Sequence, residues 1–149
     1  MTKKGVRNAV ITCAIIMSII TVLAWAILAE PWKEPELSEK IFTICETNDS
    51  IKISDITDFE WDIAYIDKQA YGTGQELQEK GIEGNFQKLE TDCLCRVAFC
   101  KGNKMVYELI LNESYVFIDD SITEITQETI LLIKKKIDEY GEHYELTLM

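Results

Sequence analysis

An uncharged apolar run extends from Ala9 to Ala29, close to the start of this 149-residue chain. As a helix, its 21 residues would be about 31 Å long at 1.5 Å per residue, which matches a bilayer hydrocarbon core of about 30 Å. The residues before the run include three basic side chains, and an acidic flank follows it. By the positive-inside rule, this asymmetry predicts a cytoplasmic segment over residues 1–7, a single transmembrane helix over residues 8–29, and an extracytoplasmic remainder.

The alternative for this run is a cleaved signal peptide, because Ala24-Trp25-Ala26 has the small-x-small form of a cleavage site. The apolar core of a signal peptide is typically about 7–15 residues long, whereas this run continues past that site through Ile27 and Leu28. Cys13 lacks the long preceding apolar stretch of a lipoprotein cysteine, and Thr12 before it is larger than usual. The sequence therefore favours a segment that is retained as an anchor in the cell membrane.

The chain after the apolar run is strongly acidic. From residue 30 onward it carries 12 basic against 26 acidic side chains, a formal charge of −14. Such a surface repels the phosphates of nucleic acids and attracts cations or basic partners, so nucleic-acid binding is excluded. Solubility alone is the other interpretation of this charge.

The domain boundaries follow from the prolines and from the length of the chain. Pro31 and Pro35 both fall within residues 30–40, a charged segment that is predicted to be an extended spacer. Residues 41–149 then suffice for one small acidic domain. Ile51 and Ile53 indicate a short first strand in it.

The segment after Thr57 alternates between apolar and polar residues. Phe59, Trp61, Ile63 and Tyr65 would share one face of a half-buried strand, which makes Trp61 a core aromatic residue. Asp62 would lie on the opposite face, either solvated or bonded to a neighbouring backbone group.

Gly72-Thr73-Gly74 has two interpretations. A phosphate-binding loop would need a longer glycine-rich turn with a lysine, or a third glycine at the helix start, and neither is present. Thr73 and Glu76 instead have the spacing of a capping box, with Tyr71 near enough to pack on Leu77. Gly81 supplies a left-handed residue where a short helix would end.

A hairpin is predicted further along the chain. The apolar runs Cys93–Cys100 and Met105–Leu111 flank a Gly-Asn turn, and Tyr115–Ile118 would follow as a third strand of an antiparallel meander. Residues 126–149 fit either a helix or a hairpin that turns near Tyr140-Gly141, and we favour the hairpin. The predicted fold class is therefore α+β: a transmembrane helix, then an antiparallel meander with one short helix.

Four cysteines lie in the predicted domain: Cys45, Cys93, Cys95 and Cys100. Cys93 and Cys95 would be about 6.6 Å apart along one strand face, too far to bond to each other, so a disulfide would need one of the other two. A four-thiolate zinc site is a weaker alternative, because C-x-C within a strand splays poorly for tetrahedral ligation. Buried free thiols are the third interpretation.

The motifs of common enzymes are missing. His143 is the sole histidine, and the sequence contains none of the HExxH, GxSxG, GK[ST] or EF-hand patterns. Carboxylates on one exposed strand repel each other and stay solvated, so they do not form an acid-base pair. We predict no enzyme activity and no cofactor, and would test only for loosely bound calcium at these carboxylates: Asp58, Glu60, Asp62, Asp119 and Asp120.

One pattern carries a resemblance. Asp58-Phe59-x-Trp61-Asp62-x-x-Tyr65, a Tyr-containing turn into a short helix, and a hairpin with Phe99 and Val106-Tyr107 resemble small exported proteins of Gram-positive bacteria with no established function. The resemblance covers about half of the chain and implies a membrane-anchored or lipoprotein-like extracytoplasmic domain. The chain departs from it in having Ala70-Tyr71 where Pro-Tyr is expected, and in lacking a lipobox.

These observations predict a non-enzymatic binding or accessory domain, held at the membrane by its N-terminal helix, with a protein or envelope component as partner. Glu60, Asp62 and Tyr71 are its candidate binding residues. The alternative is a thiol or metal-binding module built on the four cysteines of the domain.

Overall fold

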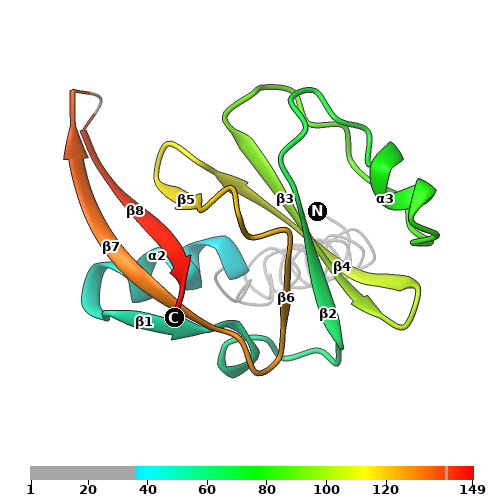
Figure 1. The fold of residues 1–149 in the computed structure, drawn as a ribbon, viewed down its shortest axis with the longest axis horizontal. Helices are drawn as coiled ribbons and strands as arrows, with labels where there is room; N and C mark the ends of the chain where they lie inside the picture. Colours follow the sequence, from blue (N-terminus) through cyan, green and yellow to red (C-terminus); the bar gives the residue numbers. More distant parts are fainter. Residues whose placement is uncertain (1–35, 140) are drawn as a thin grey trace, which may run out of the picture. The chain divides into compact units, whose positions relative to one another are not determined.

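The computed structural model describes residues 36–139 and 141–149. The elements in this part of the chain form two four-stranded sheets with two short helices (Figure 1). In chain order they are α2 (Leu37–Thr47), β1 (Ser50–Lys52), the 3-10 turn η1 (Ile53–Asp55), β2 (Ile63–Asp67), α3 (Gln75–Glu79), β3 (Leu94–Lys101), β4 (Lys104–Asn112), β5 (Val116–Ile118), β6 (Glu124–Thr126), β7 (Ile130–Asp138) and β8 (Gly141–Leu148).

The first sheet has the strand order β1-β7-β8-β5. β7 and β8 form a long antiparallel hairpin in which Asp138 is paired with Gly141, so the predicted C-terminal hairpin is confirmed. β5 joins β8 in parallel, with Val116 opposite Tyr144. The second sheet has the order β4-β3-β2-β6, and all of its pairs are antiparallel.

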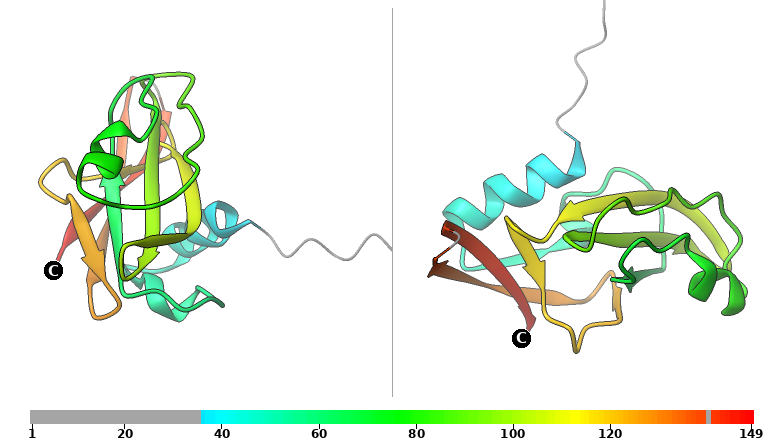
Figure 2. Two further views of the ribbon diagram at one scale, coloured as in Figure 1. Left: turned by 90° about the vertical axis from the view of Figure 1, so that its right-hand side faces the viewer. Right: turned by 90° about the horizontal axis from the view of Figure 1, so that it is seen from above.

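The main hydrophobic core lies between the two sheets and α2 (Figure 2). A second, smaller cluster covers the other face of β3, where Ala98 and Cys100 pack with Leu77 of α3 and with Ile82. Because β3 is covered on both faces, its residues from Cys95 to Cys100 are all buried. This explains why apolar residues follow one another from Val97 to Cys100 without alternating with polar ones.

Helix α2 forms because Leu37, Ile41 and Cys45 recur at a spacing of four residues and bury one face in the main core. The helix begins inside residues 30–40, which the sequence analysis assigned to an extended spacer. The burial of Leu37, 6% exposed, accounts for the difference, because tertiary packing stabilises a first turn that local composition does not favour.

The strand predicted from Phe59 begins later. β2 starts at Ile63, and Phe59 and Trp61 pack in the main core while Ile63 and Tyr65 face the second cluster. The four residues therefore do not share one face, although Trp61 is confirmed as a core residue, 1% exposed.

Helix α3 is present, but the predicted capping box is wrong. Its N-cap is the left-handed Gly74, and no side chain caps the helix. A Cβ atom on Gly74 would lie 2.4 Å from the Phe86 ring, so packing as well as the positive φ requires glycine there. Gly81 has φ +85° after the helix, as expected, and the Tyr71 side chain is 60% exposed.

The predicted meander is also wrong. The β3–β4 hairpin forms as expected, with Lys101 paired to Lys104 across the turn. β5 then leaves this sheet and pairs with β8, because Val116 and Ile118 become buried in the main core from the side of the first sheet.

The predicted fold class and membrane topology require correction. The transmembrane helix expected over residues 8–29 lies outside the described residues, and no helix within the described ranges is long and apolar enough to cross a bilayer. The longer of the two, α2, has 11 residues, about 16 Å, and carries charged side chains. The structure therefore gives a predominantly β fold of two sheets, and the predicted membrane anchor and extracytoplasmic location are not carried forward.

Candidate functional site

Two of the predicted binding residues stabilise the β3–β4 hairpin turn. Asp62 accepts a hydrogen bond from the backbone N–H of Gly102 at 2.9 Å, and Glu60 forms an ion pair with Lys101. The hydrogen bond from Lys101 lowers the pKa of the exposed Glu60 carboxyl. Both carboxylates therefore have structural partners in this turn.

The third predicted residue, Tyr71, lies beyond the other end of β2, so the structure does not group it with Glu60 and Asp62. It has φ +58°, a conformation that costs a bulky residue about 1–2 kcal/mol, and its side chain is 60% exposed.

The cysteines are not brought together either. All four are free: Cys45 is on α2, Cys95 faces the main core, Cys100 faces the second cluster, and Cys93 is exposed. Burial raises the pKa of Cys45 to about 11 and that of Cys95 to about 12, and it also raises the pKa of Cys100. The buried thiols are therefore protonated at neutral pH, which makes them poor nucleophiles and poor metal ligands.

We expect iodoacetamide at pH 8 to alkylate Cys93 in the folded domain and to reach Cys45, Cys95 and Cys100 only after unfolding. The same burial links these thiols to stability, because the pKa values of Cys45 and Cys95 are higher in the folded than in the unfolded state. Their contribution to the free energy of unfolding is fully present below about pH 9 and is lost as the pH rises toward 11–12. Peptide mass mapping before and after denaturation measures the order of modification. Equal labelling of Cys93 and Cys95 in the native protein would contradict the burial described above.

The carboxylates proposed for calcium are dispersed. Asp119 accepts hydrogen bonds from the hydroxyl and the backbone N–H of Ser121, which lower its pKa. Asp120 forms an ion pair with Lys68 at 2.9 Å, and Asp58 is exposed on a different loop. Within the described ranges, no group of three or more His, Cys, Asp or Glu side chains is placed to hold a metal ion.

Arg96 is the most deeply buried charged residue of the described part, with a side chain that is 0% exposed. Its guanidinium forms ion pairs with Asp67 and with Glu108, the latter at 2.7 Å between Nε and Oε1. It also donates hydrogen bonds to the carbonyl oxygens of Gly72 and Gln87. The network holds the long connection between β2 and β3 against the second sheet, so the role of Arg96 is structural.

Lys68 forms a second polar cluster near the end of β2. Its ammonium group lies 3.0 Å from Glu113 Oε1 and 3.9 Å from the centre of the Phe117 ring. Burial alone would lower the pKa of Lys68, but hydrogen bonds to Asp120 and Glu113 outweigh it and raise the pKa. A lysine held charged in this way supports the loops around it and is not a candidate base or nucleophile.

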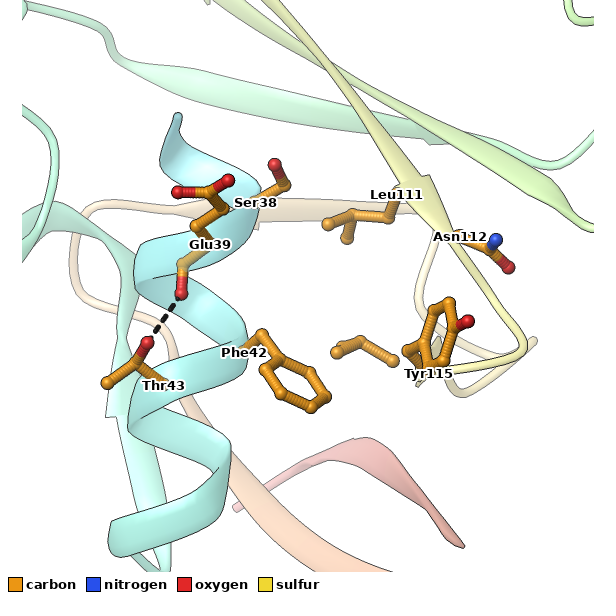
Figure 3. A pocket seen from close by; sticks show the side chains of 8 residues that line it. Ser38, Glu39, Phe42, Thr43, Leu111, Asn112 and Tyr115 are labelled. Atoms are coloured by element: carbon orange, nitrogen blue, oxygen red, sulfur yellow. Dashed lines mark hydrogen bonds between the residues drawn. The ribbon is translucent and has the colours of Figure 1, made fainter. Parts of the chain in front are cut away.

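A groove with a volume of about 500 Å³ lies between α2 and the β4–β5 connection (Figure 3). Phe42 enters it from α2, while Leu111 and Tyr115 come from the opposite wall. The Phe42 ring meets the Tyr115 ring edge-on at 6.3 Å between centroids. We call this hollow the α2–β5 groove, and it is lined by Ser38, Glu39, Phe42, Thr43, Leu111, Asn112, Tyr115 and Val116.

The lining of the α2–β5 groove combines an apolar base with a polar rim. Tyr115 is 57% exposed although its neighbours Leu111 and Val116 are buried, so an aromatic ring is left accessible beside apolar walls. Glu39 adds a carboxylate, and the Thr43 hydroxyl is already engaged with the Glu39 carbonyl oxygen at 2.9 Å. The volume lies within the range of about 300–1,000 Å³ that is typical of binding pockets.

The groove could not be predicted from the sequence, because its walls come from residues about 70 positions apart, which only the fold brings together. The one local signal is the exposed Tyr115 at the start of a strand. His143 lies elsewhere, in a smaller pocket with Phe117, and its Nδ1 atom is 3.7 Å from Asp138. Comparisons of the chain with protein-family models, with curated proteins and with solved structures find no match.

Proposed function

We propose that this domain is a non-enzymatic protein-binding module, and that the α2–β5 groove receives an apolar anchor side chain from a basic segment of its partner. The observation that carries the proposal is the accessible Tyr115 ring within a groove of about 500 Å³ that is apolar at its base. Exposed aromatic residues next to a concave apolar surface are typical of the energetic centres of protein interfaces.

The charge of the domain supports a basic partner. Residues 36–149 carry 11 basic against 24 acidic side chains, a formal charge of −13, and Glu39 places one carboxylate at the groove itself. Lysines beside the anchor residue would therefore be attracted at long range and could pair with Glu39 on docking.

A panel of short peptides tests the proposal. Each peptide carries one Ile, Leu, Phe or Trp between lysine pairs, and a matched panel has glutamates in place of the lysines. We expect the lysine peptides to bind and the glutamate peptides to fail, as measured by fluorescence polarisation and by NMR shifts of groove residues. We expect Tyr115→Ala to weaken binding by about 30-fold, the loss of about 2 kcal/mol that is typical of an interface hot spot.

Tyr71→Ala is the matched control, because it removes an equally exposed tyrosine outside the groove. It should leave peptide affinity unchanged, whereas Glu39→Lys should reduce affinity for the lysine peptides alone. Failure of every lysine peptide to bind, or binding that survives Tyr115→Ala, would refute the proposed function.

A further inference from the structure

The outer half of the β7–β8 hairpin carries an exposed apolar residue, Ile137, with three lysines before it and Asp138 and Glu139 after it. We define the hairpin arm as residues 134–138 of β7 and 141–143 of β8; its β7 half consists of exposed residues alone. Three consecutive lysines, Lys134–Lys136, precede Ile137, which is 76% exposed. An apolar branched side chain next to a basic run is therefore presented at the surface of a domain whose charge is otherwise strongly negative.

The pleat of β7 explains why Ile137 is left uncovered. Successive side chains alternate between the faces of a strand, so Leu131, Ile133, Lys135 and Ile137 share one face. Leu131 is in the main core and Ile133 packs against it, but the core ends before Ile137. The apolar row therefore extends beyond the interior of its own domain, which leaves an apolar side chain available to another molecule.

Ion pairs and strand pairing order the hairpin arm in the unbound domain. Lys135 pairs with Glu142 at 2.7 Å and Lys136 with Glu145 at 3.1 Å, and the strand pairing continues to Asp138 and Gly141. Each of these exposed ion pairs contributes little to stability, so the lysines can exchange partners. An ordered ribbon loses less conformational entropy on docking than a flexible peptide does.

We propose that the hairpin arm of one copy of this chain docks in the α2–β5 groove of a second copy, with Ile137 as the anchor and the lysines beside Glu39. This inference rests on the proposed function, because it identifies the basic partner of the groove as the chain itself. The charge of −13 on residues 36–149 opposes association at long range, so the contact is expected at physiological salt, where screening confines that repulsion to about 8 Å. Reciprocal docking of two arms and two grooves would close a dimer.

Sedimentation of the full chain over a range of concentrations tests this inference. We expect the wild type to self-associate, and Ile137→Asp and Tyr115→Ala each to weaken association at least tenfold. Val106→Asp is the control, because it places the same charge at another exposed apolar residue, on β4, and should leave association unchanged. A mixture of the Ile137→Asp and Tyr115→Ala variants should form heterodimers, because one supplies an intact groove and the other an intact arm.

Self-association that persists in Ile137→Asp, or mixed variants that stay monomeric while the wild type associates, would overturn the inference. A wild type that remains monomeric at every concentration would also overturn it. If the wild type is monomeric but the lysine peptides bind the groove, the proposed function stands and only self-association is refuted. If the lysine peptides also fail to bind, both proposals are refuted.

Discussion

Replacing Arg96 by methionine is expected to lower the free energy of unfolding by about 3–5 kcal/mol, a large part of the stability of a small domain. The guanidinium is fully buried between two carboxylates, Asp67 and Glu108, whose side chains are 3% and 9% exposed. Without it, two negative charges would remain in a region that water does not reach, and the carbonyl oxygens of Gly72 and Gln87 would each lose a donor. Urea denaturation followed by circular dichroism measures the loss.

The companion variants separate charge from packing. The triple variant Asp67→Leu, Arg96→Met and Glu108→Leu should recover part of the loss, because no unpaired charge stays buried. Lys101→Met removes the exposed ion pair with Glu60 and should leave the free energy of unfolding nearly unchanged. An Arg96→Met protein as stable as the wild type would show that the network contributes nothing to the fold.

Trp61→Ala is expected to cost about 3–5 kcal/mol for a different reason, the loss of a large core side chain. Trp61 is 1% exposed, and its ring packs edge-on against Phe99 at 5.0 Å between centroids. Its Nε1–H donates to the Thr57 hydroxyl at 3.0 Å, and its carbonyl oxygen accepts a bond from Gln127. The side chain therefore links the segment before β2 to the main core, and its removal leaves a cavity there.

Thermal and chemical denaturation of the variant should be followed by far-ultraviolet circular dichroism, because the substitution removes a fluorescent reporter. Trp61→Phe keeps an aromatic ring in the core and should cost markedly less than Trp61→Ala. Tyr115→Ala, at an exposed aromatic residue, should change stability by about 0.5 kcal/mol or less. Equal destabilisation by Trp61→Ala and Tyr115→Ala would argue against the burial of Trp61.

The local turns could be predicted from the sequence because their causes lie within a few residues. Gly102-Asn103 between two apolar runs predicted the β3–β4 hairpin, and the region near Tyr140-Gly141 predicted the β7–β8 turn. The burial of Trp61 was predicted from the alternation of apolar residues after Thr57 and is confirmed, although β2 begins only at Ile63.

The candidate site could be predicted only in part. Asp62 accepts a backbone hydrogen bond from Gly102, which is one of its two expected states, whereas the ion pair of Glu60 with Lys101 was not predicted. Arg96 gave a signal, a charge inside the apolar run of β3, but its partners Asp67 and Glu108 are 29 and 12 residues away. The sequence carries almost no signal for the α2–β5 groove, because neither wall has a pattern of its own that indicates a binding site.

The sequence by itself determined the acidic charge and the β3–β4 hairpin, since these depend on composition and on contacts between near neighbours, whereas it left residues 126–149 open to either a helix or a hairpin. Tertiary structure alone decided that β5 joins β8 and not β4, that α2 closes the core, and that Phe42 meets Tyr115 across a groove. The physical reason is that burial of apolar surface is not directional, so a pattern states which side chains leave water but not which distant segment covers them.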